Sequence, residues 1–506
     1  MANSRLKNTK RNIIWSYIDF AITLIFQFVS RTIIIHVLGS QYLGLSSLFS
    51  SILQVLNMAE LGFSSAVIYN LYKPIAENDI DAVCALLAFY RKIYRIVGSI
   101  IILIGLILVP FLPHLIKGSY PETINIYTLY LLYLANTGIS YFLFAYKASL
   151  LNALQRMDLV KIAYSIINIT QCIFQILVLV LFKNYYLFVI GTILGSASKN
   201  LLAAYFAKRN FPQYVCKGVI SNSTRQSIWK RVRGLLICKI SGVTYTTFDS
   251  IILSAMIGLV PVAIYNNYIT IYNSVANIII LVRHAMQASV GNSVASESIE
   301  KNYNDVFVWQ FLFSSIAIFC SICLMCLYQP FMTLWMGQEM LLTQIDVLIL
   351  SLLFYISTVQ HAFYLYLSGN GLWWELRWPY ILSTITNLIL NVLLCRYLGI
   401  TGIILATLIA QFVFGLMWQS TIIFKEYFKR SVGTYLKRQL KYTGIGLLIG
   451  FVSYFICGLI SIESILGLFI KALICLLLCP TSLLLIFRNT REFLQSKDLA
   501  TRVIRR

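Results

Sequence analysis

Long apolar runs, separated by short polar links, fill most of this 506-residue sequence. An α-helix needs about 20 predominantly apolar residues to cross the hydrocarbon core of a bilayer. Fourteen runs meet that requirement. They fall at roughly 13–37, 42–72, 84–112, 123–150, 158–182, 186–207, 234–257, 262–290, 305–328, 342–368, 378–396, 401–424, 442–460 and 464–487. The pattern predicts an all-α integral membrane protein with about fourteen transmembrane helices.

The composition agrees with lipid as the main solvent. Hydrophobic residues make up 59% of the chain and charged residues only 11%, against about 25% charged residues in ordinary soluble domains. The polar stretch MANSRLKNTKR precedes the first apolar run, as a charged segment precedes the core of a signal peptide. That run is too long for a signal peptide and has no small-residue cleavage site, so we expect a retained helix.

Lysine and arginine are distributed unevenly between the two sets of links. The formal net charge is +22. With the N-terminus in the cytoplasm, all but six of the 40 basic residues fall in or beside cytoplasmic segments. The exceptions are Lys117, Lys183 and Arg396 in outer links and Arg31, Lys239 and Lys471 within spans. This bias follows the positive-inside rule and predicts that both termini are cytoplasmic. The basic stretches are then topology signals or contacts with anionic lipid, and we expect no nucleic-acid partner.

The longest hydrophilic segment, residues 208–233, divides twelve of the predicted helices into six plus six. A weak internal repeat supports this division. The stretch RTIIIHVLGSQYLGLSSLFSSI begins at Arg31, and DSIILSAMIGLVPVAIYNNYITI begins at Asp249, so that Gly39 aligns with Gly258. Paired halves are how many transporters build a central site with alternating access. We therefore expect an N-terminal lobe (1–207), a cytoplasmic linker (208–233), a C-terminal lobe (234–424), and two extra helices with a basic tail (425–506).

Two opposite charges fall at matching places in the repeat. Arg31 lies about 12 Å from the outer end of the first helix, and Asp249 about 13 Å from the outer end of the seventh. An ionisable residue inside a bilayer costs about 2.5–3.5 kcal/mol and usually faces a cavity or a partner. One interpretation is that both residues line a hydrated cavity, where the planar fork of Arg31 binds an anionic headgroup. The other is that they pair and join the two halves.

Further ionisable residues lie nearer the cytoplasmic side. Asp19 and Glu60 are each about 27 Å from the outer ends of their helices. Both are candidates for ion coupling, or else they reach the interface or bond locally near the inner mouth. Lys239 and Arg283 lie near the inner ends of the seventh and eighth helices. They are interfacial anchors or part of a basic rim that attracts lipid phosphate.

The eighth and eleventh predicted helices carry an unusual number of tyrosines and asparagines. These side chains suit sugars, because rings stack on sugars and amides offer paired donors and acceptors. Hydrogen bonding between helices explains them equally well. The candidates for substrate contact are Tyr265, Tyr268, Tyr272 and Asn273 on the eighth helix and Asn387 and Asn391 on the eleventh.

No arrangement of residues indicates an enzyme. The sequence has no P-loop and no nucleophile elbow, and its four histidines are scattered. Cys320, Cys323 and Cys326 repeat every three residues, but no histidine or acidic residue lies within ten positions of them. We expect them to be packing residues and expect no metal and no cofactor. Transport would then depend on an ion gradient, a membrane potential or the gradient of the substrate itself.

Several stretches resemble the polysaccharide flippases of bacterial surface-polysaccharide gene clusters. They are RTIIIHVLGSQYLGLSSLFSSILQVLNMAELGFSSAVIYNLYKPIAENDIDAV, FYRKIYRIVGSIIILIGLILVPFLP, SYFLFAYKASLLNALQR, FDSIILSAMIGLVPVAIYNNY and LSGNGLWWELRWPYILSTITNLILNVLLCRYLGITGIILATLIA. These flippases belong to the multidrug/oligosaccharidyl-lipid/polysaccharide exporter superfamily. The resemblance extends from about residue 12 to about residue 430, and it is most specific in helices 1–3, 7–8 and 10–12.

The resemblance implies a pair of six-helix lobes around a central cavity, working by alternating access in a bacterial plasma membrane. Its implied substrate is an undecaprenyl-pyrophosphate-linked oligosaccharide, made by glycosyltransferases and passed to a polysaccharide polymerase after export. Arg31 and Asp249 lie in matching stretches, and Arg31 is the only cation well inside the first lobe. A drug/cation antiporter of the same superfamily is the main alternative. A membrane enzyme of polysaccharide synthesis is disfavoured because the outer links are short.

Overall fold

The computed structural model describes residues 2–60, 63–460 and 464–504. Within these ranges, side chains are described except at residues 2–10, 59, 64–66, 227, 230, 231, 233–239, 241, 245, 246, 288 and 498–504. The described chain is built from helices and connecting turns and contains no strand. The predicted all-α membrane fold is therefore confirmed.

The described helices include eleven that are long and apolar enough to cross a membrane. A twelfth candidate is the pair Ile126–Phe142 and Ala145–Ala153, which bends by 45° at its break. The described residues of predicted spans 42–72 and 234–257 are helical as well, but these spans are not among the candidates. The first is interrupted by a 3₁₀ segment that ends at residue 60, and several side chains of the second lie outside the described residues. The count of fourteen is therefore not confirmed.

The contacts divide the chain into two compact units, Met1–Ala263 and Ile264–Arg506. The first unit contains α1 (Ala2–Val37), α2 (Ser40–Leu56), η1 (Asn57–Glu60), α3 (Phe63–Ala76), α4 (Ile80–Leu108), η2 (Val109–Leu115), α5 (Ile126–Phe142), α6 (Ala145–Ala153), α7 (Met157–Phe182), α8 (Tyr185–Asn210) and α9 (Asn222–Met256).

The second unit begins within α10 (Leu259–Ser296). It continues with α11 (Ile299–Met336), η3 (Gln338–Met340), α12 (Gln344–Val359), α13 (His361–Asn370), α14 (Arg377–Leu398), α15 (Ile400–Ala410), η4 (Gln411–Gln419), α16 (Ser420–Ile423), η5 (Phe424–Phe428), α17 (Gly433–Gly458), α18 (Ile465–Phe487) and α19 (Arg491–Ile504).

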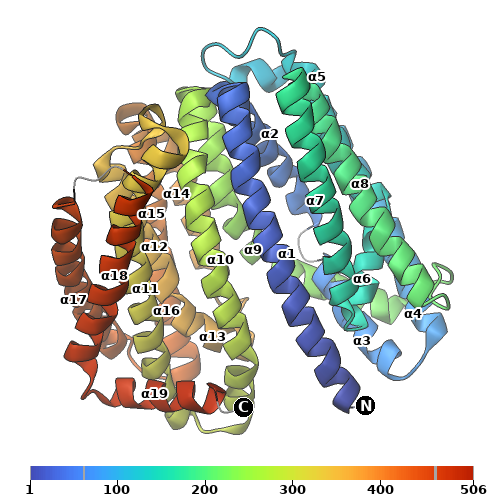
Figure 1. The fold of residues 1–506 in the computed structure, drawn as a ribbon. Coiled ribbons are helices and arrows are strands. Elements are labelled where there is room, and N and C mark those ends of the chain that lie inside the picture. The colour runs from blue at the N-terminus through green and yellow to red at the C-terminus, as the bar shows by residue number, and fades with distance from the viewer. Residues whose placement is uncertain (1, 61–62, 461–463, 505–506) are drawn as a thin grey trace. The chain divides into compact units, whose positions relative to one another are not determined.

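In the first unit, α7 lies between α1 and α8 along most of its length (Figure 1). Small residues allow the close approach: a Cβ added at Gly195 of α8 would lie 2.0 Å from the Gln171 Oε1 of α7. Small residues at helix contacts are typical of membrane proteins, where close packing takes the place of hydrophobic driving force. The polar face of α7 is thereby held against neighbouring helices and away from lipid.

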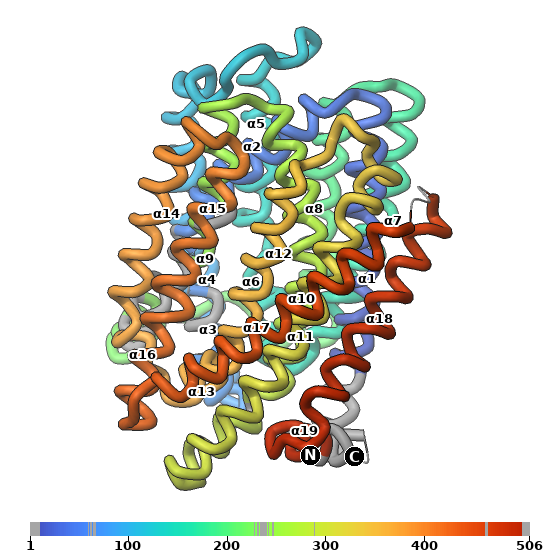
Figure 2. Tube along the Cα trace, turned by 90° about the vertical axis from the view of Figure 1, so that its left-hand side faces the viewer, coloured from blue at the N-terminus to red at the C-terminus, as the bar shows by residue number. Residues whose placement is uncertain are grey.

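In the second unit, α11 is the central helix and contacts α12, α17 and α18 (Figure 2). Buried amides fix α17 in place. The Gln310 Nε2 of α11 donates to the Tyr435 carbonyl at 2.9 Å and to Gln439 Oε1 at 3.1 Å. The Gln439 Nε2 donates to the Tyr355 hydroxyl at 2.8 Å. Of the two helices predicted as additions to the lobes, α17 is therefore anchored to this unit through hydrogen bonds, and α18 packs against α11 and α17.

The helix α9 belongs to the first unit, where it packs against α2 and α3. The sequence division instead placed residues 234–257 at the start of the C-terminal lobe. Contacts show which helices pack together, whereas the predicted lobes are the parts of the protein that move as units during alternating access. One helix can pack against one lobe and move with the other. The predicted lobe boundaries therefore stay a prediction.

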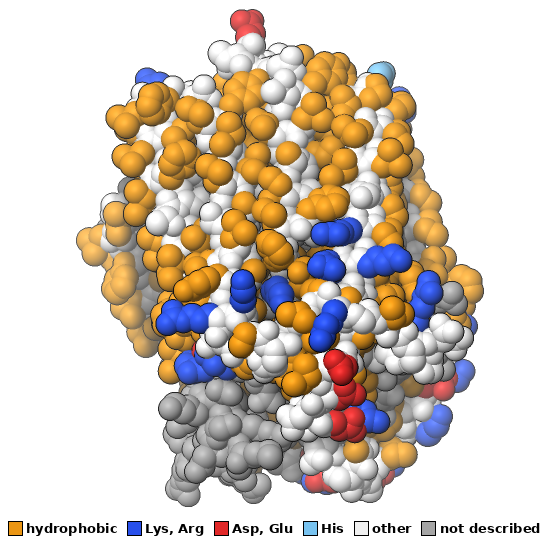
Figure 3. All heavy atoms as spheres, turned by 90° about the vertical axis from the view of Figure 1, so that its right-hand side faces the viewer, with side chains coloured by type: hydrophobic (Ala, Val, Ile, Leu, Met, Phe, Trp, Pro, Cys, Tyr) orange, Lys and Arg blue, Asp and Glu red, His pale blue; other side chains and the backbone are white. Residues whose placement is uncertain are grey.

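One face of the molecule shows how its charge is arranged (Figure 3). Apolar side chains cover the upper part of this face, and lysine and arginine gather in a band below them. Exposed basic residues include Lys92 and Arg95 about midway along α4, and Lys208 and Arg209 at the end of α8. All four belong to the basic segments that the sequence predicts to lie on the cytoplasmic side.

Candidate substrate-translocation sites

Arg31 lies on α1, inside the apolar span Arg11–Val37, and is only partly exposed. Its guanidinium lies within electrostatic range of Tyr185 at the start of α8. The Tyr185 hydroxyl is 2.9 Å from that of Tyr133, which donates to the Ser46 Oγ at 2.9 Å. We call Arg31, Ser46, Tyr133 and Tyr185 the Arg31 cluster. The cation lies beside the Tyr185 hydroxyl of α8, which is joined through Tyr133 of α5 to Ser46 of α2. A guanidinium beside a chain of hydroxyls offers donors that suit a phosphate.

Asp249 lies on α9 and is 1% exposed. A carboxylate this deeply buried lies in protein and away from lipid, as expected for an ionisable group within a membrane. Arg31 and Asp249 both belong to the first unit. Their predicted roles in cavity lining or pairing stay predictions.

Asp19 forms an ion pair that the sequence did not predict. Its Oδ2 lies 2.7 Å from the Lys161 Nζ of α7. The same face of α7 continues with Ser165, Asn168, Gln171 and Gln175, all of them buried. The Asn168 Nδ2 donates to the Thr23 Oγ1 of α1 at 3.3 Å. Asp19 is therefore part of a polar seam between α1 and α7, which favours the packing interpretation of this residue over ion coupling.

Glu60 ends the 3₁₀ segment η1, where the α2–α3 span is interrupted. Its carboxylate accepts from the Tyr94 hydroxyl of α4 and, at 2.9 Å, from the Tyr141 hydroxyl of α5. The Tyr90 hydroxyl donates to that of Tyr94 at 2.8 Å. None of the ion pairs among the described side chains includes Glu60. The carboxylate is therefore held by hydroxyls of two other helices at the point where the span is interrupted, and its predicted role in coupling stays a prediction.

The four predicted sugar contacts of α10 have different surroundings. Tyr268 is fully buried, donates to the Gln329 Oε1 at 2.7 Å and accepts from the Leu342 N–H at 3.2 Å. Tyr265 is 3% exposed, and the Tyr272 ring packs edge-on against Phe354. Asn273 is exposed. The contacts of Tyr268 are those of a packing residue, and Asn273 is the most accessible of the four.

Asn387 and Asn391 lie one turn apart on α14, and both are 0% exposed. The Asn387 Nδ2 donates to the Thr407 Oγ1 of α15 at 3.0 Å, and the Asn391 Nδ2 donates to the Asn387 Oδ1 at 3.3 Å. These bonds join α14 to α15, as polar side chains do between membrane helices. Their predicted contact with substrate is not tested by this geometry.

Arg283 is partly buried near the inner part of α10. Its Nη1 lies 3.5 Å from the His361 Nδ1, and its guanidinium is 5.7 Å from the centre of the Tyr364 ring. The side chain of Lys239 lies outside the described residues. Of the predicted basic rim, the structure therefore describes Arg283 alone, in an aromatic setting that the sequence did not indicate.

Two cavities in the second unit lie side by side and share Met325 and Tyr454. The first, which we call the polar cavity, has a volume of about 540 Å³ and is lined by Gln329, Thr333, Gln338, Gln344, Ser464 and Lys471 among others. The second, the apolar groove, has a volume of about 670 Å³ and is lined mainly by Ile318, Ile322, Leu348, Leu352, Gly446 and Phe451. Periodicity along a single helix could not reveal them, because each is formed by helices far apart in the sequence.

Apolar helices long enough to span a bilayer, with charged and polar side chains held inside them, define a polytopic membrane protein of the transporter class. A family model described as "Polysaccharide biosynthesis protein" matches residues 9–290. Since this match covers more than half of the chain, the protein belongs to the polysaccharide biosynthesis protein family. The resemblance noted from the sequence is thereby confirmed. No curated protein matches the sequence.

Solved structures with the same fold include both flippases and drug transporters. A structure titled lipid II flippase MurJ in an inward closed conformation has a TM-score of 0.64 and 16% identity, and the match covers 94% of this chain and 99% of that one. An inward-facing multidrug resistance MATE family transporter of the MOP superfamily also has a TM-score of 0.64, with 15% identity and coverage of 81% and 98%. A point mutant of the Vibrio cholerae MATE transporter VcmN has a TM-score of 0.59, with 14% identity and coverage of 85% and 100%. At these identities the likeness concerns the fold.

Proposed function

We propose that this protein is a flippase that moves an undecaprenyl-pyrophosphate-linked oligosaccharide across a bacterial plasma membrane. The observation that carries the proposal is the Arg31 cluster, a cation inside a span beside a chain of linked hydroxyls, in a protein of the polysaccharide biosynthesis family. Arginine binds phosphate through paired hydrogen bonds, and its charge persists at any physiological pH. A pyrophosphate is the charged group that such a lipid must carry through the membrane.

The apolar groove supports the same proposal from the side of the lipid tail. It is formed by α11, α12 and α17, and almost all of its lining is apolar. A prenyl chain gains about 0.8 kcal/mol for each CH₂ removed from water, so it has no reason to leave an apolar environment during transport. In the proposed mechanism the tail stays in lipid or in such a groove, and the sugars cross by alternating access.

The direction of transport follows from the proposed orientation. The basic links support cytoplasmic termini, because positively charged links are retained in the cytoplasm under the positive-inside rule. The substrate would then be completed by glycosyltransferases at the inner leaflet and delivered to a polymerase at the outer leaflet.

Of the two candidates for ion coupling, Glu60 has the more suitable surroundings, because Asp19 is already paired with Lys161. Asp249→Asn is expected to impair export at unchanged protein abundance, whereas a fall in abundance alone would assign Asp249 to packing.

The decisive experiment is deletion of the gene, with surface polysaccharide and lipid-linked oligosaccharide measured in the same cells. We expect loss of the polymer and accumulation of the intact lipid-linked unit on the inner face, with both reversed by the wild-type gene. Export of small cations is the rival function, because the multidrug transporter structures share the fold to the same degree. Normal polymer together with sensitivity to cationic drugs would replace our proposal with that function.

A further inference from the structure

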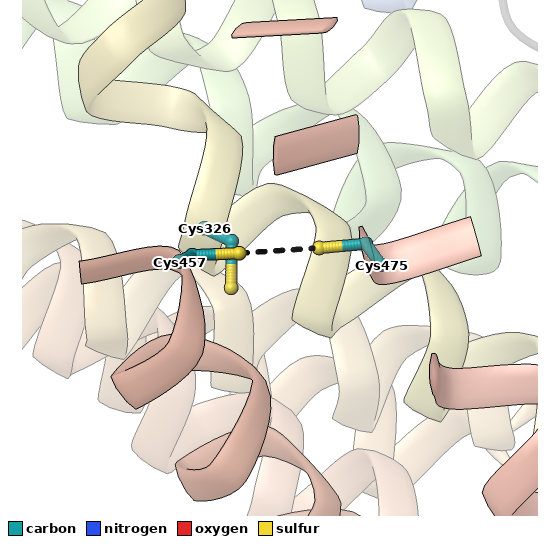
Figure 4. Close-up of side chains that lie close together, drawn as sticks. All are labelled: Cys326, Cys457 and Cys475. Atoms are coloured by element: carbon teal, nitrogen blue, oxygen red, sulfur yellow. Dashed lines mark hydrogen bonds between the residues drawn. The ribbon is translucent and has the colours of Figure 1, made fainter. Parts of the chain in front are cut away.

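Three cysteines of the second unit converge from three different helices (Figure 4). They are Cys326 of α11, Cys457 of α17 and Cys475 of α18, and their Sγ atoms all lie within 4.8 Å of one another. The Cys457 and Cys475 Sγ atoms are 4.0 Å apart. Each side chain is at most 5% exposed. We call these residues the thiol triad.

Spacing along a single helix gave no sign of this cluster. No histidine or carboxylate lies within ten positions of Cys320, Cys323 or Cys326 along the chain. The partners of Cys326 are instead 131 and 149 positions further along the chain. Six of the ten described cysteines lie on α11, α17 and α18. Packing alone requires small apolar side chains at these positions but does not require that three sulfur atoms meet.

The surroundings of the triad also suit an ion. Cys326 and Cys457 line the polar cavity, which gives a route to the sulfur atoms and room for a water molecule. Lys471 of α18 lines the same cavity. A lysine within a span is costly unless it faces a cavity or an opposite charge. A negatively charged centre at the triad would provide that charge.

We propose that the thiol triad binds a thiophilic divalent cation, Zn²⁺ being the reference ion, with a cavity water as the fourth ligand. Zinc binds thiolates at about 2.3 Å in tetrahedral geometry, which places neighbouring sulfur atoms about 3.8 Å apart. Closing the triad to that spacing needs shifts of less than about 1 Å. Binding releases three thiol protons to water, so that three S–H bonds are replaced by three Zn–S bonds. The resulting centre has a charge of −1, which Lys471 offsets.

The consequence for the protein is a cross-link between helices. The ion would join α17 and α18 to α11, and it would hold the wall between the polar cavity and the apolar groove in one arrangement. This role does not depend on what the protein transports. Binding of Zn²⁺ to the thiol triad should weaken steeply as the pH falls, because three protons compete with one ion.

The test uses the full-length protein, purified under reducing conditions, loaded with Zn²⁺ and passed over a desalting column. We expect about one equivalent of zinc per chain by mass spectrometry of the metal. Cys457→Ser is expected to lose at least ten-fold in zinc affinity, whereas Cys172→Ser, the same change on α7 of the first unit, should bind as the wild type does. Co²⁺ in place of Zn²⁺ should show sulfur-to-metal charge-transfer absorption in the wild type and in Cys172→Ser, and this absorption should be diminished in Cys457→Ser.

A second measurement covers the case in which Cys457→Ser does not fold. In the wild type, Zn²⁺ should protect three thiols from alkylation, and peptide mapping should assign them to Cys326, Cys457 and Cys475. The proposal is wrong if the wild type retains no zinc, or if Cys457→Ser binds it equally well. It is also wrong if protein alkylated directly in its native membranes contains a Cys457–Cys475 disulfide.

Discussion

Arg31 is a charged side chain within a membrane span, and its contribution to transport can be tested by substitution. It stands in a mainly apolar span, beside Tyr185, whose hydroxyl is linked through Tyr133 to Ser46. Arginine forms paired hydrogen bonds with phosphate through its planar fork, whereas lysine keeps the charge without that fork. The value of this position to transport can therefore be measured apart from its value to folding.

We expect Arg31→Ala to abolish export of surface polysaccharide while leaving the protein in the membrane. A hydrogen bond to a charged group contributes about 1.5–3 kcal/mol, so its loss lowers binding by about 10- to 100-fold. Arg31→Lys keeps the charge but loses the planar fork, and we expect intermediate export. Arg396→Ala, at an exposed position at the end of α14, is the matched control. Full export by Arg31→Ala would remove this site from the proposal.

The Asp19–Lys161 pair gives a prediction about stability. Lys161→Ala leaves the Asp19 carboxylate buried without its 2.7 Å partner, and an uncompensated buried charge typically costs about 3–5 kcal/mol. The double variant Asp19→Asn with Lys161→Met removes both charges and should recover most of that loss. Thermal unfolding in detergent and abundance in the membrane would measure this. Equal loss of thermal stability in the single and double variants would show that the Asp19–Lys161 ion pair does not determine the stability of this region.

At the scale of the helix, close contacts depend on glycines. A Cβ added at Gly44 of α2 would lie 2.2 Å from the Leu259 carbonyl oxygen at the start of α10. That oxygen belongs to the backbone, so relief requires a shift of a whole helix. Gly444 of α17 is a helical glycine with no atom within 4 Å of the same added group. The two positions form a matched pair for the same chemical change.

We expect Gly44→Ala to lower the free energy of unfolding by about 1–3 kcal/mol, as overpacking does in close-packed interiors. Gly444→Ala should be neutral or stabilising by up to about 1 kcal/mol, because alanine loses less backbone entropy in a helix. Thermal unfolding of both purified variants would measure the difference. A Gly44→Ala variant as stable as Gly444→Ala would show that α2 is not held against this turn.

For the whole molecule, the distribution of charge predicts the orientation in the membrane. Basic side chains gather at one level of the face in Figure 3, and positively charged links are retained in the cytoplasm. Alkaline phosphatase fused after Gly118 should be active, whereas the same enzyme fused after Gly218 should be inactive. A fluorescent protein at these two points should give the opposite pattern. Activity after Gly218 would reverse the proposed orientation and, with it, the direction of transport.

Much of the architecture was predictable because a bilayer imposes a length and a polarity on each helix separately. Twelve of the fourteen predicted spans coincide with the candidate spans of the structure, and the broken pair α5–α6 lies within one of them. Hydropathy could not predict the interruption near residue 60. A 3₁₀ turn with a carboxylate is stabilised by the hydroxyls of Tyr94 and Tyr141, and those lie on other helices.

The sequence by itself determined that this is a helical membrane protein, which residues carry charge inside its spans, and which family it resembles. These properties are local, because each depends on the residues of one run. Only the tertiary structure decided that Asp19 pairs with Lys161, that the Tyr268 hydroxyl donates to Gln329, and that Cys326 meets Cys457 and Cys475. Such encounters depend on which helices become neighbours. In a membrane, that choice follows from close packing and hydrogen bonding between whole helical faces, since apolar surface is equally favourable against lipid and against protein.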